Sequence, residues 1–200
     1  MRTLVVYCHP ADTSFAVAVR DAALEGLRAG GHEVRLTDLY AEGFDPVFSA
    51  FEHANHRTAG AMDPVVARHA DDLRWCESLV LVYPTWWAGQ PAMLKGWIDR
   101  VWTNGVAWEL PEGANRLRPL LRNIRHITVA TTHGSSKLIN ALEGEGGKRT
   151  VNRSIRVLCH PRCRTRWIAM YNIDRSTPHE RARFAQRVSD RLAREQRQRR

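Results

Sequence analysis

Hydrophobic positions divide the chain into short apolar runs separated by amphipathic segments. Runs rich in Val, Ile and Leu predict five strands, at residues 3–8, 32–39, 79–83, 123–130 and 166–173. Apolar residues three or four positions apart predict the helices that follow, at residues 14–28, 64–75, 92–102, within 137–158 and at 178–194. Residues 41–60 show no clear periodicity, and we expect a long loop there.

The regular alternation of strand and helix predicts an α/β protein with a parallel sheet and helices on both faces. The first and third strands are almost wholly apolar, as in strands buried on both sides. Ligands of such sheets bind beyond the carboxyl ends of the strands, so function is expected in the loops after strands one, three and four. One domain is expected over residues 1–195, followed by a basic tail at residues 196–200 whose disorder is left open.

Basic residues outnumber acidic ones, 30 to 21, which gives a net charge of +9. Much of the excess lies in residues 191–200, where a helix dipole favours positive charge. The excess also attracts anions such as phosphorylated cofactors. No nucleic-acid-binding motif accompanies it, and we expect no nucleic-acid partner. No apolar run reaches the ~18 residues of a membrane span and no secretory signal is recognisable, so we expect a cytoplasmic protein.

The four cysteines are expected to be reduced thiols in that compartment. Cys8 and Cys76 lie beside apolar runs and are expected in the core. Cys159, His160 and Cys163 form the only cluster that suggests zinc, but a second pair of ligands is lacking. We expect a loop there and no metal site.

Two loops carry residues suited to a ligand. The first, residues 9–15, places the hydroxyls of Thr13 and Ser14 at a helix N-terminus, where backbone N–H groups favour a phosphate; an ordinary helix cap is the alternative. The second, residues 84–91, carries Trp86 and Trp87 side by side. A flat aromatic ligand covering them accounts for two adjacent tryptophans in a loop, and a pair of core tryptophans is the alternative.

The segment PTWWAGQPAMLKGWIDRV, residues 84–101, closely resembles the flavodoxin-like NAD(P)H dehydrogenase (quinone) family. His9, Ser14 and Phe15 match the first loop of that family. Residues 131–134, Thr-Thr-His-Gly, resemble its Thr-Thr-Gly-Gly loop, with a histidine in place of the first glycine. The resemblance implies a flavodoxin-like three-layer sandwich whose five parallel strands follow the order 2-1-3-4-5.

The resemblance also implies a bound flavin, FMN or alternatively FAD, with NADPH or NADH as the electron donor. Amides of the third loop would stabilise the anionic reduced flavin. Trp87 and Trp108 are expected to wall the substrate pocket together with Trp86. His133 is the candidate catalytic donor of a proton or hydrogen bond, with a surface histidine as the alternative. The residues expected to bind the cofactor are His9, Thr13, Ser14, Phe15, Pro84, Thr85, Trp86, Trp87, Ala88, Thr131, Thr132, His133 and Gly134.

Two departures limit what carries over from the family. Ile139 and Glu145 stand where better-studied members place a tyrosine and a histidine after the third loop. Ala16 replaces the asparagine that follows the phenylalanine of the first loop. The loss of this polar group, together with the modest length, favours FMN over FAD.

We expect an oxidoreductase that passes two electrons from NAD(P)H through the flavin to a quinone-like acceptor. A flavodoxin-type electron carrier and a non-catalytic flavin-binding regulatory or ancillary subunit are the alternatives. The charge of +9 disfavours the carrier, because such carriers are usually acidic. Relatives with this motif are homodimers, and five tryptophans crowd within residues 86–108, so we expect a homodimer.

Overall fold

A computed structural model describes residues 1–56, 58 and 62–195 of the chain. Its centre is a sheet of five strands in the order β2-β1-β3-β6-β7, in which every pair of neighbours is parallel. The strands are β1 (Arg2–Tyr7), β2 (Glu33–Asp38), β3 (Ser78–Pro84), β6 (His126–Thr132) and β7 (Arg164–Met170). The predicted strand order is confirmed.

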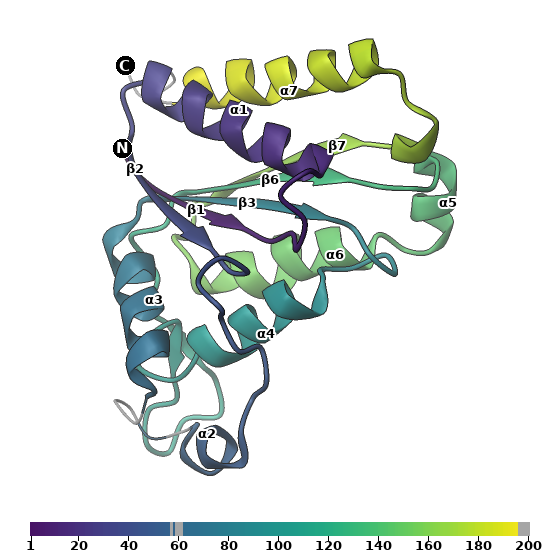
Figure 1. Ribbon diagram of the computed structural model, residues 1–200. Helices are drawn as coiled ribbons and strands as arrows, with labels where there is room; N and C mark the ends of the chain where they lie inside the picture. Colours follow the sequence, from purple (N-terminus) through teal and green to yellow (C-terminus); the bar gives the residue numbers. More distant parts are fainter. Residues whose placement is uncertain (57, 59–61, 196–200) are drawn as a thin grey trace.

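Helices cover both faces of this sheet, as Figure 1 shows. On one face lie α1 (Phe15–Ala29) and α7 (Pro178–Ala193), which pack side by side. On the other lie α3 (Pro64–Trp75), α4 (Ala92–Val101) and α6 (Gly146–Arg149). A separate apolar core fills the space on each side, because all seven residues of β3 and five of the six in β1 are buried. The three-layer α/β fold is therefore the one expected.

The close approach of α1 and α7 depends on Gly26. A Cβ atom at this position would lie 2.2 Å from the backbone oxygen of Ser189. Real side-chain carbons do not come so near another backbone, so only glycine fits here. The core beneath the two helices includes Val19 and Leu27 from α1 and Val188 from α7.

The expected loop at residues 41–60 is wrong in one part, because it contains helix α2 (Ala50–Asn55). Ser49 accepts a hydrogen bond from the backbone N–H of Glu52, and the Glu52 carboxylate accepts one from the N–H of Ser49. This reciprocal capping box is visible in the sequence as Ser-x-x-Glu, a pattern that indicates the start of a helix.

The last two strands lie a few residues from their predicted positions. β6 begins at His126 and extends to Thr132, because Thr131 and Thr132 still pair with the end of β3. β7 begins at Arg164, which pairs with His126, and ends at Met170. Ile173, expected in the last strand, starts the short 3-10 helix η3 (Ile173–Arg175).

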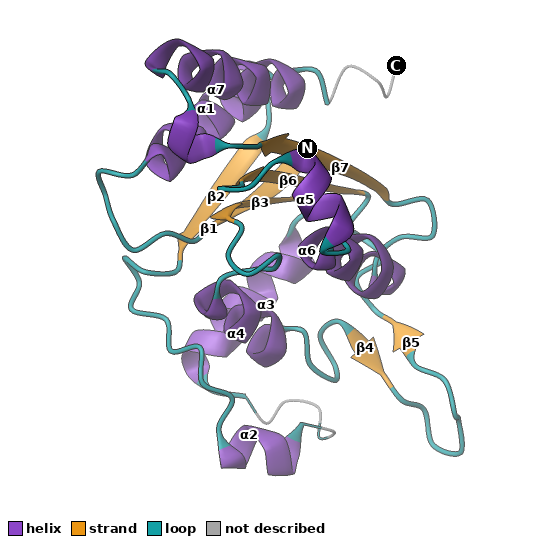
Figure 2. Cartoon of the chain, turned by 90° about the vertical axis from the view of Figure 1, so that its right-hand side faces the viewer, coloured by secondary structure: helices purple, strands orange, loops and turns teal. Residues whose placement is uncertain are grey.

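The region between β6 and β7 contains four short helical pieces, and the glycines correctly predicted the interruption between the first two. They are α5 (Lys137–Leu142), α6, the π-helix η1 (Thr150–Ile155) and the 3-10 helix η2 (Arg156–Leu158). A small hairpin of β4 (Trp108–Glu109) and β5 (Arg118–Pro119) was not predicted. Figure 2 shows it on the side of the sheet that carries α3 and α4.

Helices long and apolar enough to cross a membrane are absent from the described residues. The basic tail at 196–200 lies outside the described residues. Cys8 and Cys76 are fully buried, as expected of core residues.

Candidate functional site

A cleft of about 420 Å³ opens at the carboxyl ends of β3 and β6. This is the edge where parallel α/β sheets bind their ligands, and the volume lies in the range of small-molecule sites. The cleft brings together the loops that follow β3 and β6, both expected to bind a ligand. It also includes two residues of η3 that the sequence did not indicate. Its lining residues are Pro84, Thr85, Trp86, Trp87, Thr132, Gly134, Ile173 and Asp174.

Trp87 stands on a strained two-residue turn beside this cleft. Trp86 and Gly89 exchange backbone hydrogen bonds of 3.2 and 3.0 Å, which closes the turn. Trp87 and Ala88 at its tip have φ angles of 48° and 57°, the left-handed region that side-chain-bearing residues avoid. Each such residue costs on the order of 1–3 kcal/mol. The turn nevertheless presents Trp87 fully exposed, which points to a partner or ligand for its ring.

Support for this turn comes from the start of α6. The backbone N–H of Gly147 donates to the carbonyl oxygen of Ala88 at 2.8 Å. The side-chain amide of Gln90 donates to the carbonyl oxygen of Gly147 at 3.0 Å. A Cβ atom on Gly146 would lie only 3.3 Å from the Ala88 oxygen. The glycines at 146 and 147, expected only to interrupt a helix, let this backbone approach the tryptophan turn.

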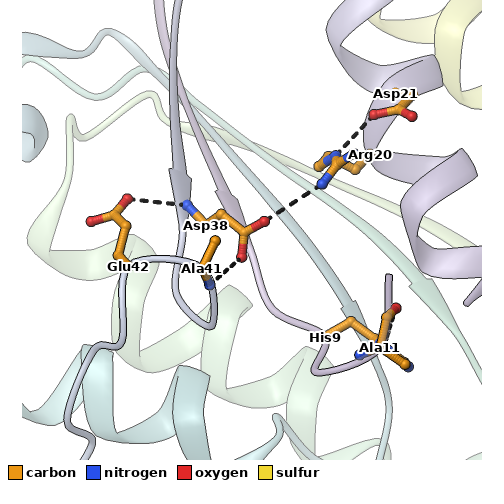
Figure 3. Close-up of polar contacts among 7 residues, drawn as sticks. All are labelled: His9, Ala11, Arg20, Asp21, Asp38, Ala41 and Glu42. Atoms are coloured by element: carbon orange, nitrogen blue, oxygen red, sulfur yellow. Dashed lines mark hydrogen bonds and ion pairs between the residues drawn. The ribbon is translucent and has the colours of Figure 1, made fainter. Parts of the chain in front are cut away.

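The first loop meets the second one through His9. Its Nδ1 accepts a hydrogen bond of 3.0 Å from the N–H of Ala11, as Figure 3 shows, so the ring is fixed within the loop. The ring centroid lies 6.3 Å from that of Trp86. The two segments, far apart in sequence, therefore lie together at one end of the cleft.

Ser14 occupies the N-cap of α1 without acting as a side-chain cap. Its Oγ is buried and makes no hydrogen bond to the backbone of α1; it lies near the Tyr7 hydroxyl, where it offsets part of the rise in pKa that burial causes in Tyr7. No acidic residue lies in the first turn of α1, where the backbone N–H groups of a helix are without intrahelical partners. The side chain of Ser14 therefore does not cap the helix, and binding of an anion at this helix N-terminus remains a prediction. Thr13 beside it is exposed.

Arg20 joins α1 to the end of β2 (Figure 3). Its guanidinium pairs with Asp21 at 2.9 Å and with Asp38 at 3.5 Å, and it lies 5.0 Å from the centroid of the Tyr7 ring. Asp38 in turn accepts a hydrogen bond from the N–H of Ala41 at 3.1 Å. These contacts hold α1 and the end of β2 in one arrangement.

His133 is buried, with 6% of its surface exposed, and lies behind the cleft rather than on its surface. Its Nδ1 is 2.6 Å from Asn140 Oδ1, and its Nε2 is 3.4 Å from Thr85 Oγ1. Burial lowers the pKa of His133, although its hydrogen bond to Asn140 offsets part of that effect. The surface histidine held as an alternative is therefore excluded, and direct contact of this ring with a ligand remains a prediction.

Trp108 lies in a different cavity from Trp87. Its Nε1 donates to the carbonyl oxygen of Trp102 at 2.9 Å. The cavity it lines has a volume of about 500 Å³ and also includes Ile98 and Trp102. Trp97 and Trp102 are buried in the core of the chain. Within one chain, the two tryptophans expected to wall a single pocket do not meet.

A doubly wound parallel sheet with an aromatic cleft at the carboxyl ends of its strands defines an α/β protein of the flavodoxin-like class. The chain belongs to the Flavodoxin_2 family, described as having a flavodoxin-like fold, whose sequence model matches residues 1–192.

Three of the proteins of known sequence or structure that are similar to it illustrate the range of the match. NAD(P)H dehydrogenase [quinone] 1 of Cavia porcellus is 30% identical over 166 residues, which are 75% of this chain and 59% of that protein. The uncharacterized NAD(P)H oxidoreductase YcaK of Escherichia coli (strain K12) is 36% identical over 110 residues, 54% of this chain and 55% of YcaK. The solved NAD(P)H:quinone oxidoreductase from Methanothermobacter marburgensis is 25% identical, with a TM-score of 0.83 and 98% of each chain covered. The match thus spans less than two thirds of the length of either relative compared by sequence.

Proposed function

We propose that this protein is a flavin-dependent oxidoreductase that passes two electrons from NAD(P)H to a quinone-like acceptor. The observation that carries the proposal is the fully exposed Trp87 on a strained turn beside the cleft. Strain of this kind persists where a functional surface requires it. The family membership and the names of the similar proteins support the same activity.

The residues present fit a flavin phosphate at one end of the site and a flat ring at the other. Ser14 and the first turn of α1 would hold the phosphate, because the hydroxyl does not cap the helix and the helix end favours an anion. Residues 84–88 would lie along one edge of the ring, and residues 131–134 along its pyrimidine edge. When bound, the flavin supplies the acceptance of a hydride and its transfer onward.

The chain's own contribution is to position the ring and to limit its contact with water. Trp86 and Trp87 give the cleft an aromatic wall, on which a nicotinamide or quinone ring stacks favourably. His133 takes part through Thr85, whose hydroxyl lies between the imidazole and the cleft. The sole cofactor we propose is the mononucleotide, because Ala16 offers no polar side chain at the first loop.

We further propose a homodimer, built on the cavity that contains Ile98, Trp102 and Trp108. Aromatic residues are enriched at interface cores, and the rim carries both signs of charge, at Lys95 and Asp99, which suits a two-fold contact. The four buried free thiols fit a reducing, cytoplasmic location.

The experiment that tests the activity is anaerobic reduction of the purified protein. The protein should be yellow, and its flavin absorption should bleach on addition of NADH or NADPH and return on addition of a quinone. Mass measurement of the released cofactor separates FMN from FAD. A flavin that NAD(P)H cannot reduce would favour an electron carrier or a regulatory subunit, and protein that neither contains nor takes up flavin would refute the proposal.

A further inference from the structure

A chain of four side chains runs from the cleft into the protein behind it. Thr131 Oγ1 lies 2.9 Å from Thr85 Oγ1, and Thr85 Oγ1 lies 3.4 Å from His133 Nε2. His133 Nδ1 lies 2.6 Å from Asn140 Oδ1. Thr85 is the member that lines the cleft, while Thr131, His133 and Asn140 are buried.

The contacts of Asn140 decide where the protons of this chain lie. One atom of its amide is 2.9 Å from the carbonyl oxygen of Ser136 and 2.7 Å from the Ser135 hydroxyl. A carbonyl oxygen only accepts, so that atom is the Nδ2 donor. The Oδ1 acceptor therefore faces His133, and a short contact of 2.6 Å requires a proton on His133 Nδ1.

The surroundings of the imidazole keep it neutral at ordinary pH. Its ring stacks on Tyr171 with centroids 4.7 Å apart and planes 22° apart, and Trp167 lies beside it at 6.5 Å. The charged groups that face it are Glu143 and Glu145, from the connection between α5 and α6. These carboxylates raise its pKa less than burial lowers it, so the net direction is downward.

A neutral ring with its proton on Nδ1 has a lone pair on Nε2, and this lone pair faces Thr85. Thr85 then donates its only proton to His133, and Thr131 must donate to Thr85, because two hydroxyls at 2.9 Å need one proton between them. The Thr85 oxygen is left with one unused lone pair.

We infer that His133 is a positioning residue, held in its Nδ1–H form by Asn140, which makes the Thr85 hydroxyl a hydrogen-bond acceptor toward the cleft. The inference rests on the proposed function. The group it receives is an N–H or O–H donor of a bound ring, either an imide N–H of the flavin or a hydroxyl of the reduced acceptor. When Nε2 takes a proton from solvent, Nε2–H donates to Thr85 instead. The O–H bond of Thr85, which keeps its proton, then points toward the cleft, and the hydroxyl becomes a donor there.

The first test is independent of activity. Nitrogen NMR of purified protein labelled with ¹⁵N-histidine, assigned by comparison with His133→Gln, should show His133 neutral and protonated at Nδ1 near neutral pH. In Asn140→Leu this preference should be lost. A ring protonated at Nε2 in the unmutated protein overturns the inference.

The second test follows the dissociation constant of FMN and the product-inhibition constant of a hydroquinone, the form of the acceptor that carries hydroxyl donors. Both are measured from about pH 4.5 to about pH 8, a range that extends below the ordinary histidine pKa. Both the original protein and Thr85→Ser should show an acid step that weakens ligand binding several-fold, whereas Thr85→Val should show none. Thr132→Val is the matched control, because Thr132 also lines the cleft and should keep the step.

The two quantities separate the possible donors. A step in the FMN constant assigns the donor to the flavin, and a step in the hydroquinone inhibition constant alone assigns it to the reduced acceptor. Flavin binding with the same pH profile in Thr85→Val and Thr132→Val overturns the inference and leaves the proposed function standing. Absence of flavin binding refutes the proposed function, and the NMR signal of His133 still reports on its tautomer.

Discussion

The backbone N–H of Gly147 donates a hydrogen bond of 2.8 Å to the carbonyl oxygen of Ala88. This contact joins the start of α6 to the tip of the turn that presents Trp87. Since Trp87 and Ala88 both have left-handed backbones, the turn is not a conformation that its own residues favour. The start of α6 holds this turn in place through the Gly147 hydrogen bond.

Substitutions of Ala88 should act in opposite directions. Ala88→Gly should stabilise the protein or leave it unchanged, by up to about 1 kcal/mol, because glycine accepts a positive φ without steric cost. Ala88→Val should destabilise it by more than about 1 kcal/mol and weaken flavin binding, since a β-branched residue fits this region poorly. Urea unfolding measures the change in stability, and flavin titration measures the change in flavin affinity. Equal effects of the two substitutions on stability would show that the turn is unstrained.

Ser14→Asp should weaken FMN binding by at least about 1 kcal/mol, because a carboxylate would face the phosphate and a charge-assisted hydrogen bond would be lost. Fluorescence titration of the protein with FMN gives the dissociation constants. Asn115→Asp, on an exposed loop, adds the same charge elsewhere and should leave the affinity unchanged. Unaltered affinity in Ser14→Asp would place the phosphate at another site.

Gly26→Ala should destabilise the protein by roughly 1–3 kcal/mol despite the better helix propensity of alanine. The added methyl group would meet the Ser189 backbone at 2.2 Å and force α1 away from α7. Glu25→Ala, at an exposed position of the same helix, should change stability by less than about 0.5 kcal/mol. Thermal or urea unfolding compares the two. A neutral Gly26→Ala would mean that the helices separate without cost.

The protein should lose stability in mild acid partly through His69. Burial lowers the pKa of this histidine from 6.5 to about 4, although Glu42 Oε2 lies 3.7 Å from its Nε2. Between these pH values the unfolded chain binds a proton at His69 and the folded chain does not. The contribution of His69 to the free energy of unfolding is therefore complete above pH 6.5 and is lost as the pH falls toward 4. Between about pH 7 and pH 5 the loss should be about 1–2 kcal/mol, and His69→Gln should lack it.

Unfolding free energies at both pH values decide this point, because the difference between them does not depend on the constant cost of the substitution. The same change at the exposed His179 is the control. An equal acid loss in His69→Gln and in the original protein would contradict the prediction.

Light scattering at micromolar concentration should give a mass near twice 22.8 kDa. Ile98→Asp should shift the protein toward single chains, because it places a charge in the apolar cavity beside Trp108. Leu117→Asp, at a half-exposed loop position, is the control and should remain dimeric. A mass near 22.8 kDa with full activity would show that one chain builds the whole site.

Local pattern in the sequence determined the elements, the layer arrangement and the family. Strand and helix periods report which residues are buried, and that is a local property of each segment. The family motif at residues 84–101 then fixed the expectation of the strand order and of the cleft loops. Even the missed helix α2 had a local signal, the capping box between Ser49 and Glu52.

Only the tertiary structure decided how distant segments meet. Gly147 supports Ala88, Asn140 orients His133, and Trp108 turns away from the cleft to donate to Trp102. None of these contacts follows from periodicity, because each depends on how one element crosses another after the core has packed. The composition of the loops indicated a binding site, and the packing around them determined which side chains line the cleft and which lie behind it.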